Sequence, residues 1–134
     1  MFLRLRDELG LSILVVTHDL GLAWNIADDV AVMYLGRIVE SGSAAAVLTD
    51  PEHPYRQTLL SVVPDERHRT PILVAGEAPD AARIPSGCRF HPRCPALTDG
   101  RLGDRSDLCR TQDPGILPAA SGHHSAYHLY SNGG

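Results

Sequence analysis

The run SILVVTHDL, from Ser12 to Leu20, is the main indication of the fold class. Residues 13–16 are all aliphatic and leave no polar face, so they predict a strand buried on both sides. Such strands belong to parallel α/β sheets, which bind ligands at the carboxyl ends of their strands. His18 lies at such an end and is a candidate site residue. From its position alone, a histidine packed against backbone remains the commoner alternative.

The segments around this strand predict short helices and one hairpin. Gly10 should end a first helix, Asp19 and Ser43 are suitable N-caps, and Pro54 can open a helix. Leu35-Gly36 is typical of a tight hairpin turn between two strand-like runs. The expected elements are helices at Phe2–Leu9, Asp19–Ala27, Ser43–Leu48 and Tyr55–Val63, and strands at Val30–Tyr34 and Arg37–Glu40.

Composition narrows the function classes. The chain has a formal net charge of −4 and 43% hydrophobic residues, as expected for one soluble domain. The mildly acidic balance gives no support for a nucleic-acid partner. No apolar run approaches the ~18–20 residues of a membrane span, and the N-terminus lacks a secretory signal pattern. We therefore expect a cytoplasmic protein.

The composition changes near residue 64. Residues 65–134 contain seven of the ten prolines and all three cysteines. Their apolar residues follow no sustained helical or strand period. We expect this part to bury little core. It would then be held by a cross-link, packed against something else, or without a fixed structure. Cysteines in such a cytosolic segment favour a metal site over a disulfide, although three unrelated thiols are the alternative. The cysteines are Cys88, Cys94 and Cys109, and zinc could be completed by His123, His124 or His128.

Two segments resemble the ATPases of ABC transporters. Residues 11–20 are similar to their switch-histidine segment, and residues 27–42 to the hairpin that follows it. The resemblance implies that His18 contacts the γ-phosphate of ATP and helps to position the hydrolytic water. Asp19 would support it as a helix cap or dimer contact. The implied fold class is α/β, the C-terminal portion of a nucleotide-binding domain followed by a loop-rich, cysteine-containing extension.

A second motif narrows the family. The run DPEHPYRQTLL, from Asp50 to Leu60, resembles the His-Pro-Tyr segment of oligopeptide and dipeptide importer ATPases. By this resemblance, residues 1–50 are the end of the nucleotide-binding domain and residues 51–134 are the extension. The segment also predicts an ordinary amphipathic helix, and we expect no catalytic role for His53 or Tyr55.

The cysteine segment carries the third resemblance. PSGCRFHPRC, from Pro85 to Cys94, is similar to the extension in which members of this family hold a 4Fe-4S cluster with four cysteines. Cys88, Cys94 and Cys109 match the first three ligand positions. Tyr127 stands where the fourth cysteine is expected, which leaves His128 or another group as a fourth ligand, and zinc as the alternative metal.

The sequence lacks the other motifs of such an ATPase. It has no Gly-x-x-x-x-Gly-Lys phosphate loop, no Leu-Ser-Gly-Gly-Gln-like signature and no aliphatic strand ending in Asp-Glu. Phosphoryl transfer needs those groups to hold ATP and Mg²⁺, so we expect a fragment that is inactive alone and marginally stable.

The implied function is the ATP-binding subunit of a di- or oligopeptide importer. It would pair with a second ATP-binding subunit and with permease subunits at the cytoplasmic face of the membrane. A non-enzymatic metal-binding module and an inactive remnant are the alternatives.

Overall fold

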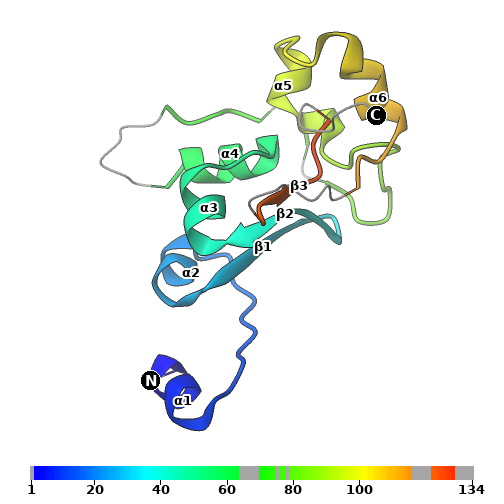
Figure 1. The fold of residues 1–134 in the computed structure, drawn as a ribbon. Helices are drawn as coiled ribbons and strands as arrows, with labels where there is room; N and C mark the ends of the chain where they lie inside the picture. Colours follow the sequence, from blue (N-terminus) through cyan, green and yellow to red (C-terminus); the bar gives the residue numbers. More distant parts are fainter. Residues whose placement is uncertain (1, 64–69, 75, 78, 116–121, 129–134) are drawn as a thin grey trace.

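The structure is a computed structural model and describes residues 2–63, 70–74, 76–77, 79–115 and 122–128. It is a small α/β arrangement in which short helices surround a three-stranded antiparallel sheet (Figure 1). The elements are α1 (Phe2–Leu9), α2 (Leu20–Ile26), β1 (Asp29–Tyr34), β2 (Arg37–Ser43), α3 (Ala44–Thr49), α4 (Pro54–Ser61), η1 (His91–Arg93), α5 (Pro95–Thr98), η2 (Gly103–Arg105), α6 (Ser106–Thr111) and β3 (His124–Ser125).

The sheet is built on the predicted hairpin. β1 and β2 pair antiparallel, and the turn residues Leu35 and Gly36 have φ values of 47° and 73°. Positive φ at both central residues is the geometry of the two-residue turns that match strand twist. β3 adds to the other edge of β2, with Glu40 opposite Ser125. Strand order is therefore β1-β2-β3, and the predicted hairpin is confirmed.

Three helices begin at the side chains that the sequence indicated. Asp19 Oδ1 accepts from the Leu22 N–H at 3.0 Å and caps α2. Ser43 Oγ accepts from the Ala46 N–H at 3.2 Å and caps α3. Pro54 is the first residue of α4. These caps satisfy donors that every helix start leaves open, so local sequence is sufficient to place them.

The predicted buried strand over Ile13–Val16 is wrong for this chain. Residues 11–17 form neither helix nor strand and pair with no strand in the described part of the chain, and the side chains of Leu14 and Val16 are each 93% exposed. The preceding helix α1 also buries none of its residues. A strand buried on both faces needs neighbouring strands and covering helices, and the described residues supply neither at this place.

The expectation that the cysteine-containing part buries little core is also wrong. The hairpin and α3 contribute Val32, Tyr34, Val39 and Val47 to the main hydrophobic cluster. All of the remaining buried members come from beyond residue 64, namely Cys88, Phe90, Cys94, Ala96, Leu102, Cys109 and Tyr127. These residues lie apart in the sequence, so no periodic pattern announces them. The loop-rich part is thus docked onto the sheet through a shared core.

No helix in the described ranges is both long enough and apolar enough to cross a membrane.

Candidate functional site

His18 ends the extended segment and precedes α2. The Thr17 hydroxyl accepts from the Asp19 N–H at 3.0 Å, and Asp19 caps α2, so the turn that carries His18 is fixed from both sides. The imidazole itself is exposed and makes no hydrogen bond with the described part of the chain. His18, the expected phosphate contact, therefore lies just before the start of α2. The described residues do not form a nucleotide-binding site around it.

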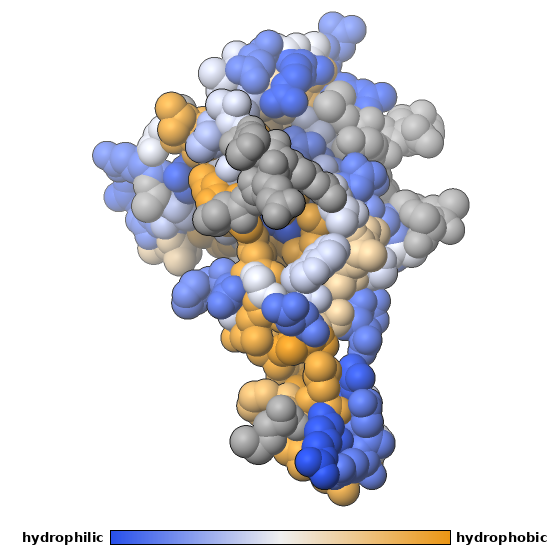
Figure 2. All heavy atoms as spheres, turned by 90° about the vertical axis from the view of Figure 1, so that its left-hand side faces the viewer, coloured by the Kyte–Doolittle hydropathy of each residue, from blue (hydrophilic) through white to orange (hydrophobic). Residues whose placement is uncertain are grey.

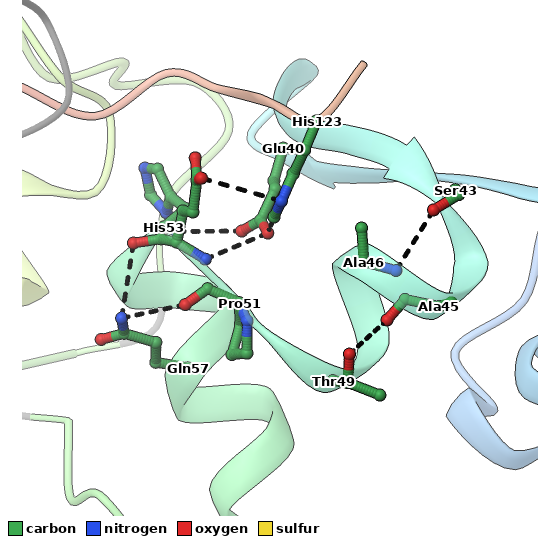
Figure 3. Close-up of polar contacts among 10 residues, drawn as sticks. Glu40, Ser43, Ala45, Ala46, Thr49, Pro51, His53, Gln57 and His123 are labelled. Carbon is green, nitrogen blue, oxygen red and sulfur yellow. Dashed lines mark hydrogen bonds and ion pairs between the residues drawn. The ribbon is translucent and has the colours of Figure 1, made fainter. Parts of the chain in front are cut away.

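The best-connected polar group is Glu40 on β2, which sequence reasoning missed. Its side chain is fully buried. The two carboxylate oxygens accept from the backbone N–H groups of Glu52 (3.1 Å) and His53 (2.9 Å). His123 Nε2 lies 2.7 Å from Glu40 Oε1 (Figure 3). One carboxylate thus joins β2, the start of α4 and the segment before β3.

The close approach of that segment depends on Gly42. A Cβ at Gly42 would lie 3.1 Å from both the Gly122 carbonyl oxygen and His123 Cα. Gly42 and Glu40 are two residues apart on β2 and share a face of the strand. A Cβ at Gly42 would also lie 3.5 Å from the side chain of Val47, which belongs to the hydrophobic cluster, so this face of β2 is covered. Burial raises the pKa of the nearby Glu52 carboxyl, and His123 opposes that rise.

The His-Pro-Tyr segment forms the start of α4 and part of the core. His53 Nδ1 accepts from the Tyr55 N–H at 3.1 Å, so the ring proton of the neutral imidazole is on Nε2. The Tyr55 ring packs against Tyr34 and Phe90, with centroids 4.6 Å and 5.4 Å away. Both side chains therefore have structural positions, His53 at the helix start and Tyr55 in the core.

The three cysteines are buried and lie together. The Cys88 N–H donates to the Cys109 carbonyl at 2.9 Å, which ties the two segments. Hydrogen bonds from the Cys109 thiol and from His53 lower the pKa of Cys88 to about 4, against the opposing effect of burial. The pKa of Cys109 is raised by the same thiol hydrogen bond and by burial, and burial raises that of Cys94. This arrangement favours one thiolate held beside a protonated partner.

The predicted fourth ligands are engaged elsewhere. His123 binds Glu40, and His128 Nε2 lies 2.8 Å from the Gln112 carbonyl oxygen. Tyr127 is buried with its ring against that of His53, at a centroid distance of 5.8 Å, and His124 lies in β3. Within the described ranges, no three His, Cys, Asp or Glu side chains are arranged so that they could hold a metal ion. The cysteines are brought together, but the donor set of a cluster or zinc site is not assembled.

Comparison with known proteins defines the class. Residues 39–100 match the family model described as the C-terminal region of oligopeptide/dipeptide transporters. Over 132 residues, 96% of the chain, it is 38% identical to a probable peptide ABC transporter ATP-binding protein of Sinorhizobium fredii. Over most of its length, the chain is therefore similar to the ATP-binding proteins of peptide ABC transporters.

Two further relatives specify which part of such a protein the chain represents. It is 39% identical to the oligopeptide transport ATP-binding protein AppF of Bacillus subtilis over 95% of its length. It is 42% identical to the dipeptide transport ATP-binding protein DppF of Haemophilus influenzae over 74% of its length. The matches cover only 38% and 31% of those relatives, and 35% of the Sinorhizobium protein. The chain therefore corresponds to the C-terminal part of an oligopeptide/dipeptide ABC-transporter ATP-binding protein.

Proposed function

We propose that this chain serves as the C-terminal part of the ATP-binding subunit of a peptide importer, in which ATP binding and hydrolysis drive uptake of di- or oligopeptides. The observation that carries the proposal is the similarity of about 40% identity that runs through both the hairpin region and the extension. The packing of these two regions around one core supports it, because it shows that the matched residues form one structural unit.

His18 is the residue that we propose to contact the γ-phosphate of ATP. Its imidazole is free of other hydrogen bonds to the described residues and is presented by a turn that Thr17 and Asp19 hold. ATP with Mg²⁺ supplies the phosphoryl group in such subunits. The chain lacks the phosphate loop and the magnesium-binding carboxylate, so we propose no turnover by the chain on its own.

The partners follow from the same proposal. We infer a second ATP-binding subunit and membrane permease subunits, with the chain at the cytoplasmic face of the membrane. The part of the chain suited to hold such contacts is the extension, since its core residues dock it firmly on the sheet.

A chimaera tests this function. The amino-terminal part of Bacillus subtilis AppF, up to the start of the matched region, would be joined to this chain and would replace AppF in the cell. We expect uptake of a labelled oligopeptide, and we expect His18→Ala to abolish it at unchanged protein level. A chimaera present at the level of AppF that supports no more uptake than its His18→Ala variant would contradict the proposal.

A second candidate function is metal binding by the extension. We propose it on one observation, the gathering of three free, buried cysteines in one core. Iron, sulfide and zinc would be measured after anaerobic purification. A broad absorbance at about 400 nm with iron and sulfide indicates a cluster, and zinc alone indicates a zinc site. Protein without bound metal would contradict this second candidate and would leave the first untouched.

A further inference from the structure

A cavity of about 200 Å³ lies beside the turn of the hairpin. That turn is at the far end of β1 from α2, away from the narrow part of the molecule in which Figure 2 shows apolar side chains gathered (Figure 1). The charged residues of the cavity lining are three arginines and two acidic residues, namely Arg83, Arg89, Arg93, Glu77 and Asp80. The lining therefore has one net positive charge, whereas the whole chain has a net charge of −4. We expect a negatively charged ligand.

Arg93 is the lining residue that points most directly to an anion. Its side chain is half-buried, and its Nε atom is buried without a hydrogen-bond acceptor among the described residues. Its backbone is fixed, because the Arg93 N–H donates to the Phe90 carbonyl at 3.0 Å. A buried guanidinium donor without an acceptor costs free energy, and an anion in the cavity would remove that cost.

The other two arginines are also able to bind a ligand. Arg89 Nη1 donates to the Leu35 carbonyl oxygen, which ties the side chain to the hairpin turn. A guanidinium has five N–H donors, so this bond leaves donors for a ligand. Arg83 Nε lies 4.0 Å from Asp80 Oδ2, and the Arg83 side chain is 90% exposed. An exposed pair at that distance is weak, so Arg83 can turn toward an anion at little cost.

The rest of the lining is largely apolar and rigid. Tyr34 is buried in the core, and three residues with a fixed φ form much of the wall, namely Pro79, Pro85 and Pro92. Apolar walls strengthen charge interactions, and rigid walls lower the entropy cost of binding. The volume is several times the ~30 Å³ that a water molecule takes up in the liquid, but below the ~300 Å³ at which pockets for drug-sized ligands begin. The cavity therefore suits an ion of a few atoms and not a nucleotide or a peptide.

We propose that Arg83, Arg89 and Arg93 bind a small, multiply charged oxyanion of the phosphate class. Guanidinium groups match the oxygens of such ions with paired N–H donors. Three guanidiniums suit the four oxygens of a tetrahedral ion better than the two oxygens of a carboxylate. The two acidic residues of the lining repel anions, so an ion with a single charge would gain little. His18 is not among the lining residues, so this binding is independent of the proposed ATP contact.

Calorimetric titration of the full chain with inorganic phosphate tests the site, with the ionic strength held constant by potassium chloride. We expect one phosphate per chain, and we expect acetate to bind at least about tenfold more weakly. Side-chain NMR gives a second measurement that needs no substitution. Phosphate should shift the Nε–H resonance of Arg93 and leave that of Arg101 in place. No saturable binding of phosphate, or binding of acetate as tight as that of phosphate, would overturn the inference.

Two substitutions at the cavity should change phosphate binding in opposite directions. Arg83→Ala should weaken it by about tenfold or more, because one charge-assisted contact is lost. Asp80→Asn should tighten it, because it removes a competing charge and keeps the Oδ1 that accepts from the Ala82 N–H at 2.8 Å. Both side chains are exposed, so the variants should fold, as unchanged circular dichroism would show.

Arg101→Ala is the matched control. Arg101 also pairs with an exposed aspartate, Asp99, at 3.5 Å, but it lies outside the cavity lining. The control should bind phosphate as the unsubstituted chain does. Equal weakening by Arg83→Ala and Arg101→Ala would reflect the net charge of the chain and would overturn the inference, as would weaker binding by the Asp80→Asn chain.

Discussion

Glu40 shows how one residue can hold three parts of a small protein. Burying a carboxylate away from water costs free energy unless its oxygens accept hydrogen bonds. Here two backbone N–H groups and His123 lie within hydrogen-bond distance of those oxygens. Removing the side chain would leave those donors buried without an acceptor. The cost of substitution should therefore exceed that of an exposed carboxylate by a wide margin.

We expect Glu40→Ala to lower the free energy of unfolding by about 3 kcal/mol or more, because three groups would lose their acceptor at a cost of about 1–3 kcal/mol each. Glu40→Gln keeps one acceptor oxygen and should cost about 1–3 kcal/mol. Urea unfolding followed by circular dichroism measures both. Glu8→Gln is the control, because Glu8 forms an exposed pair with Arg4 and its loss should change stability by less than about 1 kcal/mol. If the Glu40→Gln chain were as stable as the control, the hydrogen bonds of the Glu40 carboxylate would not contribute to the stability of the fold.

The pKa of Cys88 predicts how the stability of the chain depends on pH. Its pKa of about 4 in the folded chain lies below the ordinary value of a thiol, so the folded state releases this proton more readily than the unfolded state. Its contribution to stability is thus present at pH above the ordinary thiol pKa and is lost as pH falls through about 4. The thiolate absorbance of metal-free protein should show one thiolate per chain at neutral pH.

Two serine variants separate the thiols. Cys88→Ser should remove both the absorbance and the added rise of stability with pH. Cys94→Ser should remove neither, because burial raises the pKa of Cys94 and keeps it protonated. If the Cys88→Ser chain keeps the thiolate signal, the charge has been assigned to the wrong sulfur.

At the scale of elements, the loop that carries Cys88 is fixed by a close backbone contact at Gly87. Gly87 has φ of 69°, and a Cβ there would lie 2.6 Å from the Cys109 carbonyl oxygen at the end of α6. Backbone atoms at that distance cannot move aside cheaply. We expect Gly87→Ala to destabilise the chain by about 3 kcal/mol or more, from positive φ plus overpacking.

Gly100 provides the matched control for that contact. It has a similar φ of 75°, but a Cβ there would meet nothing within 4 Å. Gly100→Ala should therefore show the cost of positive φ alone, about 1–2 kcal/mol. Equal losses in the two variants, measured by thermal or urea unfolding, would mean that the contact between the Cys88 loop and α6 does not constrain the fold.

The elements that sequence reasoning predicted correctly are those with local causes. The helix starts depend on side chains no more than three residues away, namely those of Asp19, Ser43 and Pro54. The Leu35-Gly36 turn depends on the backbone geometry of its own two residues. The prediction of a strand over Ile13–Val16 is wrong, because such a strand depends on neighbouring strands that lie outside the segment.

The buried site features were missed for a related reason. A glutamate in a strand is usually exposed, and Glu40 is buried only because Glu52, His53 and His123 converge on it from elsewhere in the chain. Cys88, Cys94 and Cys109 were picked out as a group, and they do lie together. Their place in the core could not be predicted, since they lack any periodic pattern.

In the molecule as a whole, α1 and residues 11–16 lie apart from the core (Figure 1). They bury no residue, so they should contribute little to stability. We expect a chain that begins at Val15 to unfold with a free energy within about 1 kcal/mol of the full chain. A larger loss in urea unfolding would mean that residues 1–14 pack on the rest of the protein.

ATP turnover by the purified chain, measured with and without the amino-terminal part of AppF, shows whether this chain completes an ATP site. The chain alone carries His18 but no phosphate loop, so we predict no turnover. We predict turnover when the second polypeptide is added, rising to a plateau at equal amounts, and lost in His18→Ala. Turnover by the chain alone that disappears in the His18→Ala variant would contradict the account.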